Sequence, residues 1–191
     1  MTALLLLLTM QAPATQAKWL GQKPCKPDEK GYLLTLYQFM DGENWKVQWD
    51  ISINSDPCIN SWNGIVCNEH GAVTAILLPR NNLKGKMPQD MRLGRFEALQ
   101  ELDLSNNRIE GRLPGTLSYA TKLRKLNVAD NYMVGPLLDG LGSLPDLEYL
   151  DFSYNLFSGD VPDSYVDQRE SGCVVIENGY KENFITRATS K

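Results

Sequence analysis

Apolar residues recur along residues 73–165 in a fixed order, separated by polar residues, and the whole order occurs four times. The copies begin at Val73, Leu99, Leu123 and Leu147, at intervals of 26, 24 and 24 residues. Within each copy, apolar and polar positions alternate over a few residues, as they do in a short strand with one buried face. A self-similar period of this length is typical of a solenoid, in which each copy forms one coil and buries its apolar face against the next.

The full repeat reads L-x-x-L-x-L-x-x-N-x-L-x-G-x-L-P, with Pro136 one place early in the third copy. This is the spacing of leucine-rich repeats. We therefore predict an α/β fold: a right-handed leucine-rich-repeat solenoid with a short parallel β-sheet on its concave face, an irregular convex face and a helical N-terminal cap. The predicted repeats span residues 73–98, 99–122, 123–146 and 147–170.

An asparagine occupies the ninth position of every copy, at Asn81, Asn107, Asn131 and Asn155. The backbone must turn there, and an amide side chain offers two donors and an acceptor to groups that no regular ladder pairs. We expect these asparagines to form a buried structural ladder. Loss of one leaves buried backbone groups unpaired, so Asn131→Ala should destabilise the protein more than Asn127→Ala, whose side chain should face solvent.

Residues 18–72 are expected to form an N-terminal cap, because an uncovered solenoid exposes its core at both ends. Residues 26–29 begin a helix, with proline in the first turn and acids near the positive end of the helix dipole. Apolar residues then recur at helical spacing until Gly42, at Leu33, Leu36, Tyr37 and Met40. Three tryptophans follow, and we favour a role in covering the first coil over a carbohydrate-stacking platform for Trp45, Trp49 and Trp62.

Residues 56–67 read D-P-C-x3-W-x-G-I-V-C. Together with the G-x-L-P ending of the repeats, this string resembles plant-type leucine-rich-repeat proteins, namely receptor-kinase ectodomains and polygalacturonase-inhibiting proteins. The resemblance covers roughly Cys25 to Tyr165, and it implies extra strand character around L-x-G-x-L and 3-10 turns on the convex face. The G-x-N-W phrase at Gly42–Trp45 is more similar to protist and bacterial members, which suggests a protist member of the family.

Cys58 and Cys67 are expected to form a local disulfide in an oxidising compartment, and the resembled caps carry paired cysteines around the same tryptophan motif. A zinc site is not expected, because it needs four ligands with paired spacing and His70 is the single histidine of the sequence. Cys25 and Cys173 are left over. We favour no bond between them, in which case one or both are free or bridge to another chain.

The first 17 residues carry no charged side chain and hold an apolar run, Ala3–Met10, followed by the small residues Thr15 and Ala17. This pattern predicts a secretory signal peptide over residues 1–17, too short to span a bilayer. We therefore expect a secreted, extracellular protein. The sequence contains no N-x-S/T glycosylation acceptor, which is compatible with an alternative location in the lumen of an organelle reached by the secretory route.

Beyond Tyr165 the repeat pattern stops. Val174 and Ile176 alternate like one last short strand, and the rest of the chain is polar. Residues 171–191 are therefore expected to form a C-terminal cap strand and a flexible tail.

The formal net charge is −4, and no basic run indicates binding to nucleic acid or to an anionic membrane. No further apolar run predicts a membrane span. The sequence has no glycine-rich phosphate loop and no metal-ligand constellation, so we expect neither enzymatic activity nor a cofactor. None of these patterns bears on oligomeric state.

Function is expected on the outward side of the predicted strands, because the solenoid leaves this concave face free to vary. The third, fifth and eighth positions of the repeats give candidate ligand-binding residues at Leu77, Arg80, Glu101, Asp103, Lys125, Asn127, Asp130, Tyr149, Asp151 and Tyr154. We predict a non-catalytic module that recognises a protein or peptide partner. Two alternatives stay open: a structural or accessory subunit of a larger assembly, and an inhibitor of a secreted cell-wall hydrolase, as the resemblance implies.

Overall fold

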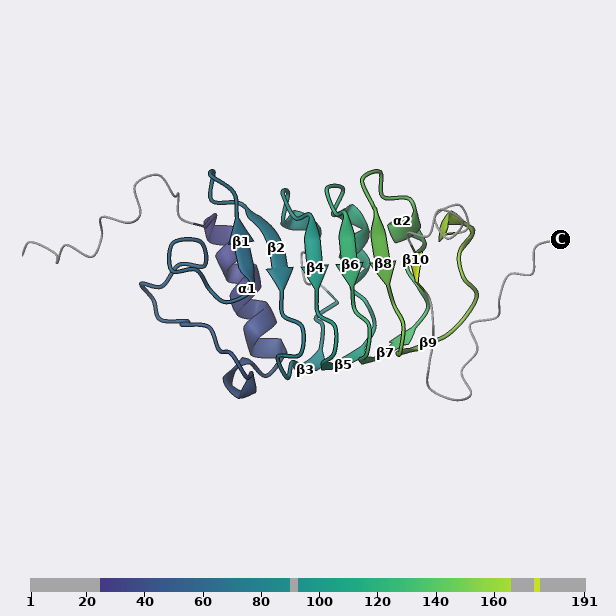
Figure 1. Ribbon diagram of the computed structural model, residues 1–191, viewed down its shortest axis with the longest axis horizontal. Helices are drawn as coiled ribbons and strands as arrows, with labels where there is room; N and C mark the ends of the chain where they lie inside the picture. The colour runs from purple at the N-terminus through teal and green to yellow at the C-terminus, as the bar shows by residue number, and fades with distance from the viewer. Residues whose placement is uncertain (1–24, 90–92, 166–173, 176–191) are drawn as a thin grey trace, which may run out of the picture.

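The computed structural model describes residues 25–89, 93–165 and 174–175, which form a short stack of coils with a helical cap at the N-terminal end (Figure 1). One face of the stack is a six-stranded sheet. Its strands, in spatial order, are β1 (Ile65–Cys67), β2 (Val73–Leu77), β4 (Glu101–Asp103), β6 (Lys125–Asn127), β8 (Tyr149–Asp151) and β10 (Val174–Val175). The predicted leucine-rich-repeat solenoid with a short parallel sheet is confirmed.

Within this sheet, neighbouring strands run parallel in the order β2, β4, β6, β8 and β10, and each successive turn of the solenoid contributes one strand. Strand β1 of the cap pairs antiparallel with β2 at the edge of the sheet, which the sequence pattern did not predict. Val66 of β1 pairs with Ala75 of β2, and the Ala75 side chain is buried. Strand β10 pairs with β8 at the other edge.

The L-x-G-x-L part of the repeat forms a second parallel sheet along the lower edge of Figure 1. Its strands, in order, are β3 (Lys84–Lys86), β5 (Arg108–Gly111), β7 (Tyr132–Gly135) and β9 (Leu156–Phe157). The extra strand character implied by the resemblance is therefore confirmed. Behind the six-stranded sheet the chain returns through short turns of helix, at η3 (Leu93–Arg95), η4 (Gly115–Tyr119), α2 (Asp139–Gly142) and η5 (Asp163–Tyr165). All but α2 are 3-10 helices, as expected.

The asparagine ladder pairs backbone groups inside the coils. Asn131 is buried, and its amide nitrogen donates to Val128 and Ala129 of its own coil and to Leu104 of the preceding coil. Asn107 and Asn155 repeat this pattern of bonds within and between coils. Asn127, by contrast, lies on the outward side of β6, where its side chain is half-buried and its oxygen accepts the Ala129 N–H at 3.0 Å.

The cap is built on helix α1 (Pro27–Phe39), followed by the 3-10 turn η2 (Gly42–Asn44). Tyr37 on α1 packs against Trp45 and Trp49. The ring centre of Trp49 lies 4.8 Å from that of Trp45 and 5.0 Å from that of Trp62. Every indole N–H has an acceptor: the Met40 carbonyl for Trp45, the Asn63 carbonyl for Trp49 and the Ser55 hydroxyl for Trp62. Because all three rings are buried, the carbohydrate-platform alternative is wrong.

Several bonds fasten the cap to the first coil. The Val47 N–H donates to the Asn81 side chain, whose amide donates back to the Val47 carbonyl. The Val73 N–H at the start of β2 donates to one carboxylate oxygen of Glu29 at 2.8 Å. The other oxygen of Glu29 is buried without a hydrogen-bond partner, and burial raises the pKa of this carboxyl above its ordinary value.

Cys58 and Cys67 form the expected disulfide, with their Cα atoms 5.6 Å apart. Cys25 is a buried free cysteine. Cys173, the predicted signal peptide at residues 1–17 and Ile176 lie outside the described residues. Within the part of the chain that the structure describes, no helix has the length and apolar character needed to cross a membrane.

Candidate functional site

The outward side chains of β4, β6 and β8 stand side by side because the three strands pair in register. One row contains Glu101, Lys125 and Tyr149, and the next contains Asp103, Asn127 and Asp151. The alternation of the strands buries the leucines between these rows, at Leu102, Leu126 and Leu150. The sequence pattern thus determines which side chains reach the surface, and the stacking of the coils brings them together.

Five of the ten predicted binding residues line one shallow pocket of about 300 Å³ on this face: Glu101, Asp103, Lys125, Asn127 and Tyr149. This volume lies at the lower end of the range for small-molecule sites, which is roughly 300–1,000 Å³. The pocket therefore suits one side chain of a larger partner better than a whole cofactor. Among the described residues, no cluster of potential ligands is suited to hold a metal ion.

The fifth-position side chains are held in place by the backbone. Asp103, Asn127 and Asp151 each accept the N–H of the residue two places on, at 2.9–3.0 Å. Such local bonds fix one oxygen of each side chain and restrict its rotation. These groups are therefore oriented before any partner arrives, which lowers the entropic cost of binding.

Tyr149 joins the two rows. Its hydroxyl donates to the second carboxylate oxygen of Asp151 at 3.0 Å. Partial burial, this hydrogen bond and the nearby negative charge of Asp103 together raise the pKa of Tyr149 to about 12. The phenol therefore stays neutral at physiological pH and presents a partly exposed ring beside two carboxylates.

The eighth-position residues lie elsewhere. Arg80, Asp130 and Tyr154 were expected to continue the strip along the strands, but they occupy the turns that follow the strands. Each has a positive φ, between 52° and 54°, in the left-handed region that tight turns require. All three are exposed and none lines the pocket, so they form one rim of the face rather than its floor. Leu77 is half-buried beside Asp103 at the N-terminal side.

Sequence reasoning missed a second group of exposed residues, on the outward side of the β3–β5–β7–β9 sheet. This group consists of Lys84 and Lys86 from the first repeat and Arg108 and Arg112 from the second, two pairs that are far apart in the chain and form no basic run. They come together because β3 and β5 are neighbours, with Lys84 paired to Arg108. Placing the repeats beneath one another and reading the positions around the repeated glycine would have shown that the first two copies are basic there.

Comparisons with known proteins agree with this architecture. A family model described as Leucine Rich Repeat matches residues 98–120 and 146–166. Protein STRUBBELIG-RECEPTOR FAMILY 1 of Arabidopsis thaliana is 35% identical over 100 residues, which cover 52% of this chain and 12% of that protein. Receptor-like protein 50 of the same plant is 37% identical over 103 residues, which cover 53% of this chain and 11% of that protein. The chain thus matches only a small part of the length of each relative.

Two solved structures superpose on most of the described solenoid. The structure of PEPR1–AtPEP1 has a TM-score of 0.63 and 31% identity, covering 72% of this chain and 19% of that chain. The second is the leucine-rich-repeat ectodomain of the plant membrane receptor kinase GASSHO1/SCHENGEN3 from Arabidopsis thaliana, in complex with CASPARIAN STRIP INTEGRITY FACTOR 2. It has a TM-score of 0.61 and 27% identity, covering 71% of this chain and 16% of that chain. The suggested protist membership stays a prediction. From its repeats and its fold, this chain contains a leucine-rich-repeat solenoid that is similar to the ectodomains of plant receptor-like proteins and receptor kinases.

Proposed function

We propose that the concave face of this chain binds a peptide, or an extended segment of a partner protein, without catalysing a reaction. The observation that carries the proposal is the pocket over β4, β6 and β8, which gathers five of the predicted binding residues on one rigid sheet. Similar architecture supports it, since the GASSHO1/SCHENGEN3 ectodomain was solved in complex with a named partner. The pocket is open and offers little desolvation, which suits recognition better than acid–base chemistry.

The pocket favours a basic side chain of the partner. Glu101 and Asp103 line it with carboxylates, and Tyr149 adds an aromatic ring on which a guanidinium or ammonium group can stack. Asp151 holds the Tyr149 hydroxyl and adds a further negative charge nearby. Lys125 is the one cation that lines the pocket, and it lies between Glu101 and Tyr149 in its row, so the more favourable positions for a basic group are over the neighbouring row of Asp103 and Asp151.

We also propose that the protein works outside the cytosol, in the extracellular space or along the secretory route. The Cys58–Cys67 disulfide supports this location, because disulfides persist in oxidising compartments. Similarity to the ectodomain of a membrane receptor kinase points the same way.

A peptide array tests the proposed recognition. Spots carry extended peptides of one frame whose central residue is arginine, lysine, leucine, glutamate or tyrosine, and the purified protein is applied at several salt concentrations. We expect the arginine and lysine spots to bind most strongly and to weaken as salt rises. Preference for the glutamate spot would refute the assignment of a basic side chain to the pocket.

Matched variants locate the site. Tyr149→Ala should weaken binding to the arginine peptide about fivefold or more, since a buried aromatic anchor contributes above ~1 kcal/mol. Tyr119→Ala, which removes an exposed tyrosine from η4, should leave binding unchanged. Asp103→Asn keeps the bond to the Ser105 N–H and removes only the charge, so it should weaken binding up to about fivefold, whereas Asp163→Asn should not. Binding that is unaffected by both pocket substitutions would overturn the proposal.

A further inference from the structure

The outward side of the β3–β5–β7–β9 sheet is chemically unlike the concave face. We call it the lateral face and define it by two parts. The basic half consists of Lys84 and Lys86 on β3 and of Arg108 and Arg112 on and just after β5, and the apolar half consists of Tyr132 and Val134 on β7. All six side chains are exposed.

The basic half carries a concentrated positive charge on a protein whose net charge is −4. Glu110, which pairs with Lys86 in the register of the sheet, is the one carboxylate on β3 and β5. None of the four cations takes part in an ion pair with another residue that the structure describes. Their charges are therefore available to an incoming anion.

Two of these cations lie flat against the sheet because the next coil has a glycine beneath them. A Cβ atom on Gly111 would lie 3.3–3.6 Å from the side-chain carbons of Lys86, and one on Gly135 would lie 3.0–3.1 Å from the side chain of Arg112. Both glycines have positive φ, 82° and 89°. The repeated glycine thus serves the turn and also makes room for the stem of a basic residue from the preceding coil. Because the stems of Lys86 and Arg112 already pack against the sheet, these side chains lose less rotamer freedom on binding.

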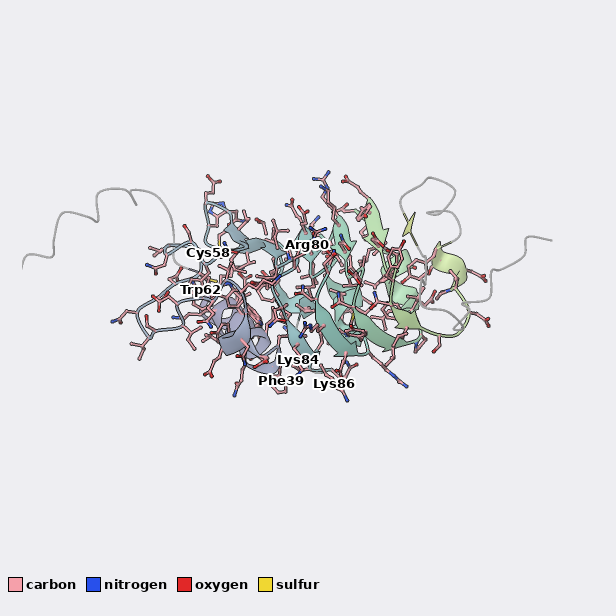
Figure 2. The ribbon with its side chains drawn as sticks, turned by 60° about the horizontal axis from the view of Figure 1, so that its bottom comes forward. Phe39, Cys58, Trp62, Arg80, Lys84 and Lys86 are labelled. Atoms are coloured by element: carbon pink, nitrogen blue, oxygen red, sulfur yellow. A yellow bond between two sulfur atoms is a disulfide. The ribbon has the colours of Figure 1, made fainter. Side chains whose placement is uncertain are left out.

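Apolar groups flank the basic half on both sides. Tyr132 and Val134 expose 45% and 39% of their surface on β7, two large apolar side chains in one short strand. On the other side, the Lys84 N–H donates to the Met40 carbonyl, which brings the end of α1 and the exposed Phe39 beside β3. Figure 2 shows Phe39, Lys84 and Lys86 grouped along the edge of the molecule that comes forward in that view.

We propose that the lateral face is a second docking surface, and that its partner is an extended protein segment with acidic residues followed by apolar ones. Four strands about 4.8 Å apart span roughly 15 Å, which an extended chain crosses in about five residues. The carboxylates of such a segment would lie over β3 and β5, and its apolar side chains would lie over β7. The apolar half distinguishes this partner from a uniformly anionic polysaccharide, and the small number of cations distinguishes it from an anionic lipid surface.

A labelled peptide of three glutamates followed by leucine, tyrosine and leucine is the probe, measured by fluorescence anisotropy against the whole chain. Wild-type protein should bind it, and the Lys84→Glu/Arg108→Glu variant should bind at least about tenfold more weakly, because two attractions become repulsions. The control Lys46→Glu/Arg95→Glu changes the net charge equally at exposed positions of the cap and of η3, and should bind within about twofold of wild type. Equal binding by both double variants, or no binding by the wild type, would overturn the proposal.

Three further probes test the chemistry of the partner. A peptide of the same composition with its glutamates and apolar residues interspersed should bind more weakly, and equal binding would refute the acidic-then-apolar order. Tighter binding of an oligogalacturonate, or of phosphatidylserine vesicles, would replace the protein segment by that ligand. Amide chemical-shift changes caused by the probe should map to β3, β5 and β7. Changes that map to β4, β6 and β8 would move the interaction to the concave face, whose basic-peptide recognition is tested separately by Tyr149→Ala.

Discussion

The coils and the N-terminal cap pair their buried polar groups in different ways. In the coils, Asn107, Asn131 and Asn155 each bind the backbone of their own coil and of a neighbour, so one residue type solves the same problem at each step. In the cap, buried polar groups are paired by contacts that each occur once, such as the bond from the Trp62 indole to the Ser55 hydroxyl, and one oxygen of Glu29 has no partner. The coils thus repeat one pattern of polar pairing, whereas the cap depends on individual contacts.

In the first coil, a ladder asparagine bonds to the cap. Asn81 occupies the ladder position, but its side chain bonds to Val47 of the cap, where the later asparagines bond to a preceding coil. The Val47 backbone thus replaces the missing coil. The junction also contains Glu29, the one described residue with a buried side-chain oxygen that has no hydrogen-bond partner. The repeated coils therefore pair their buried polar groups with one another, and the unpaired buried oxygen lies in the cap.

The cap should therefore show the largest effect of a single substitution. Trp49 contacts Trp45, Trp62 and Tyr37, so Trp49→Ala leaves a large cavity beneath α1. We expect it to lower the free energy of unfolding by about 3–5 kcal/mol, measured by urea denaturation followed by far-ultraviolet circular dichroism. Tyr119→Ala at an exposed position should change it by less than about 0.5 kcal/mol. A loss of similar size for the two variants would contradict the central place of Trp49 in the cap.

Within the coils, the effect of one ladder asparagine should be intermediate. Asn131→Ala removes bonds to backbone groups of two coils and leaves buried carbonyls unpaired, so we expect a loss of about 1–3 kcal/mol in the free energy of unfolding. Asn127→Ala removes one bond, to the partly buried Ala129 N–H, and should cost less. Urea titrations of the two variants side by side give the comparison. Equal midpoints would mean that the ladder contributes nothing beyond an ordinary turn.

The fold of the repeated coils could be predicted from the sequence, whereas several contacts of the cap could not. The coils, the parallel sheet of the concave face and the ladder were predicted because each depends on a pattern repeated at a fixed interval, whereas the strand character of the second sheet was implied by the family resemblance. The pairing of β1 with β2 was not, since Ile65–Cys67 has no counterpart in the repeat and joins the sheet only once the cap has folded. Glu29 was interpreted as a favourable charge at a helix start, and its bond to Val73 links residues that lie far apart in the chain.

Part of the candidate site could likewise be predicted from the sequence, and part could not. Strand alternation predicted the pocket residues on β4, β6 and β8. It failed at the eighth position, because the left-handed turns at Arg80, Asp130 and Tyr154 end the alternation. The basic half of the lateral face was missed for another reason. Its members belong to two different coils, so only the register between β3 and β5 brings their charges together.

Substitution of Glu29 should have the smallest effect on the free energy of unfolding, and it tests directly the buried, unpaired oxygen of the cap. Burial raises its pKa in the folded protein above the ordinary value of 4.5, so the folded state holds this proton more tightly than the unfolded state does. Its contribution to stability is therefore complete below that ordinary pKa and is lost as the pH rises through the folded pKa. Glu29→Gln removes the charge at every pH, and its stability relative to wild type should rise between pH 4 and pH 7, as measured by urea unfolding at both values. Glu43→Gln, at an exposed position of η2, should keep a constant difference from wild type. If Glu29→Gln also keeps a constant difference, Glu29 binds its proton equally in the folded and unfolded protein, and burial does not raise the pKa of its carboxyl.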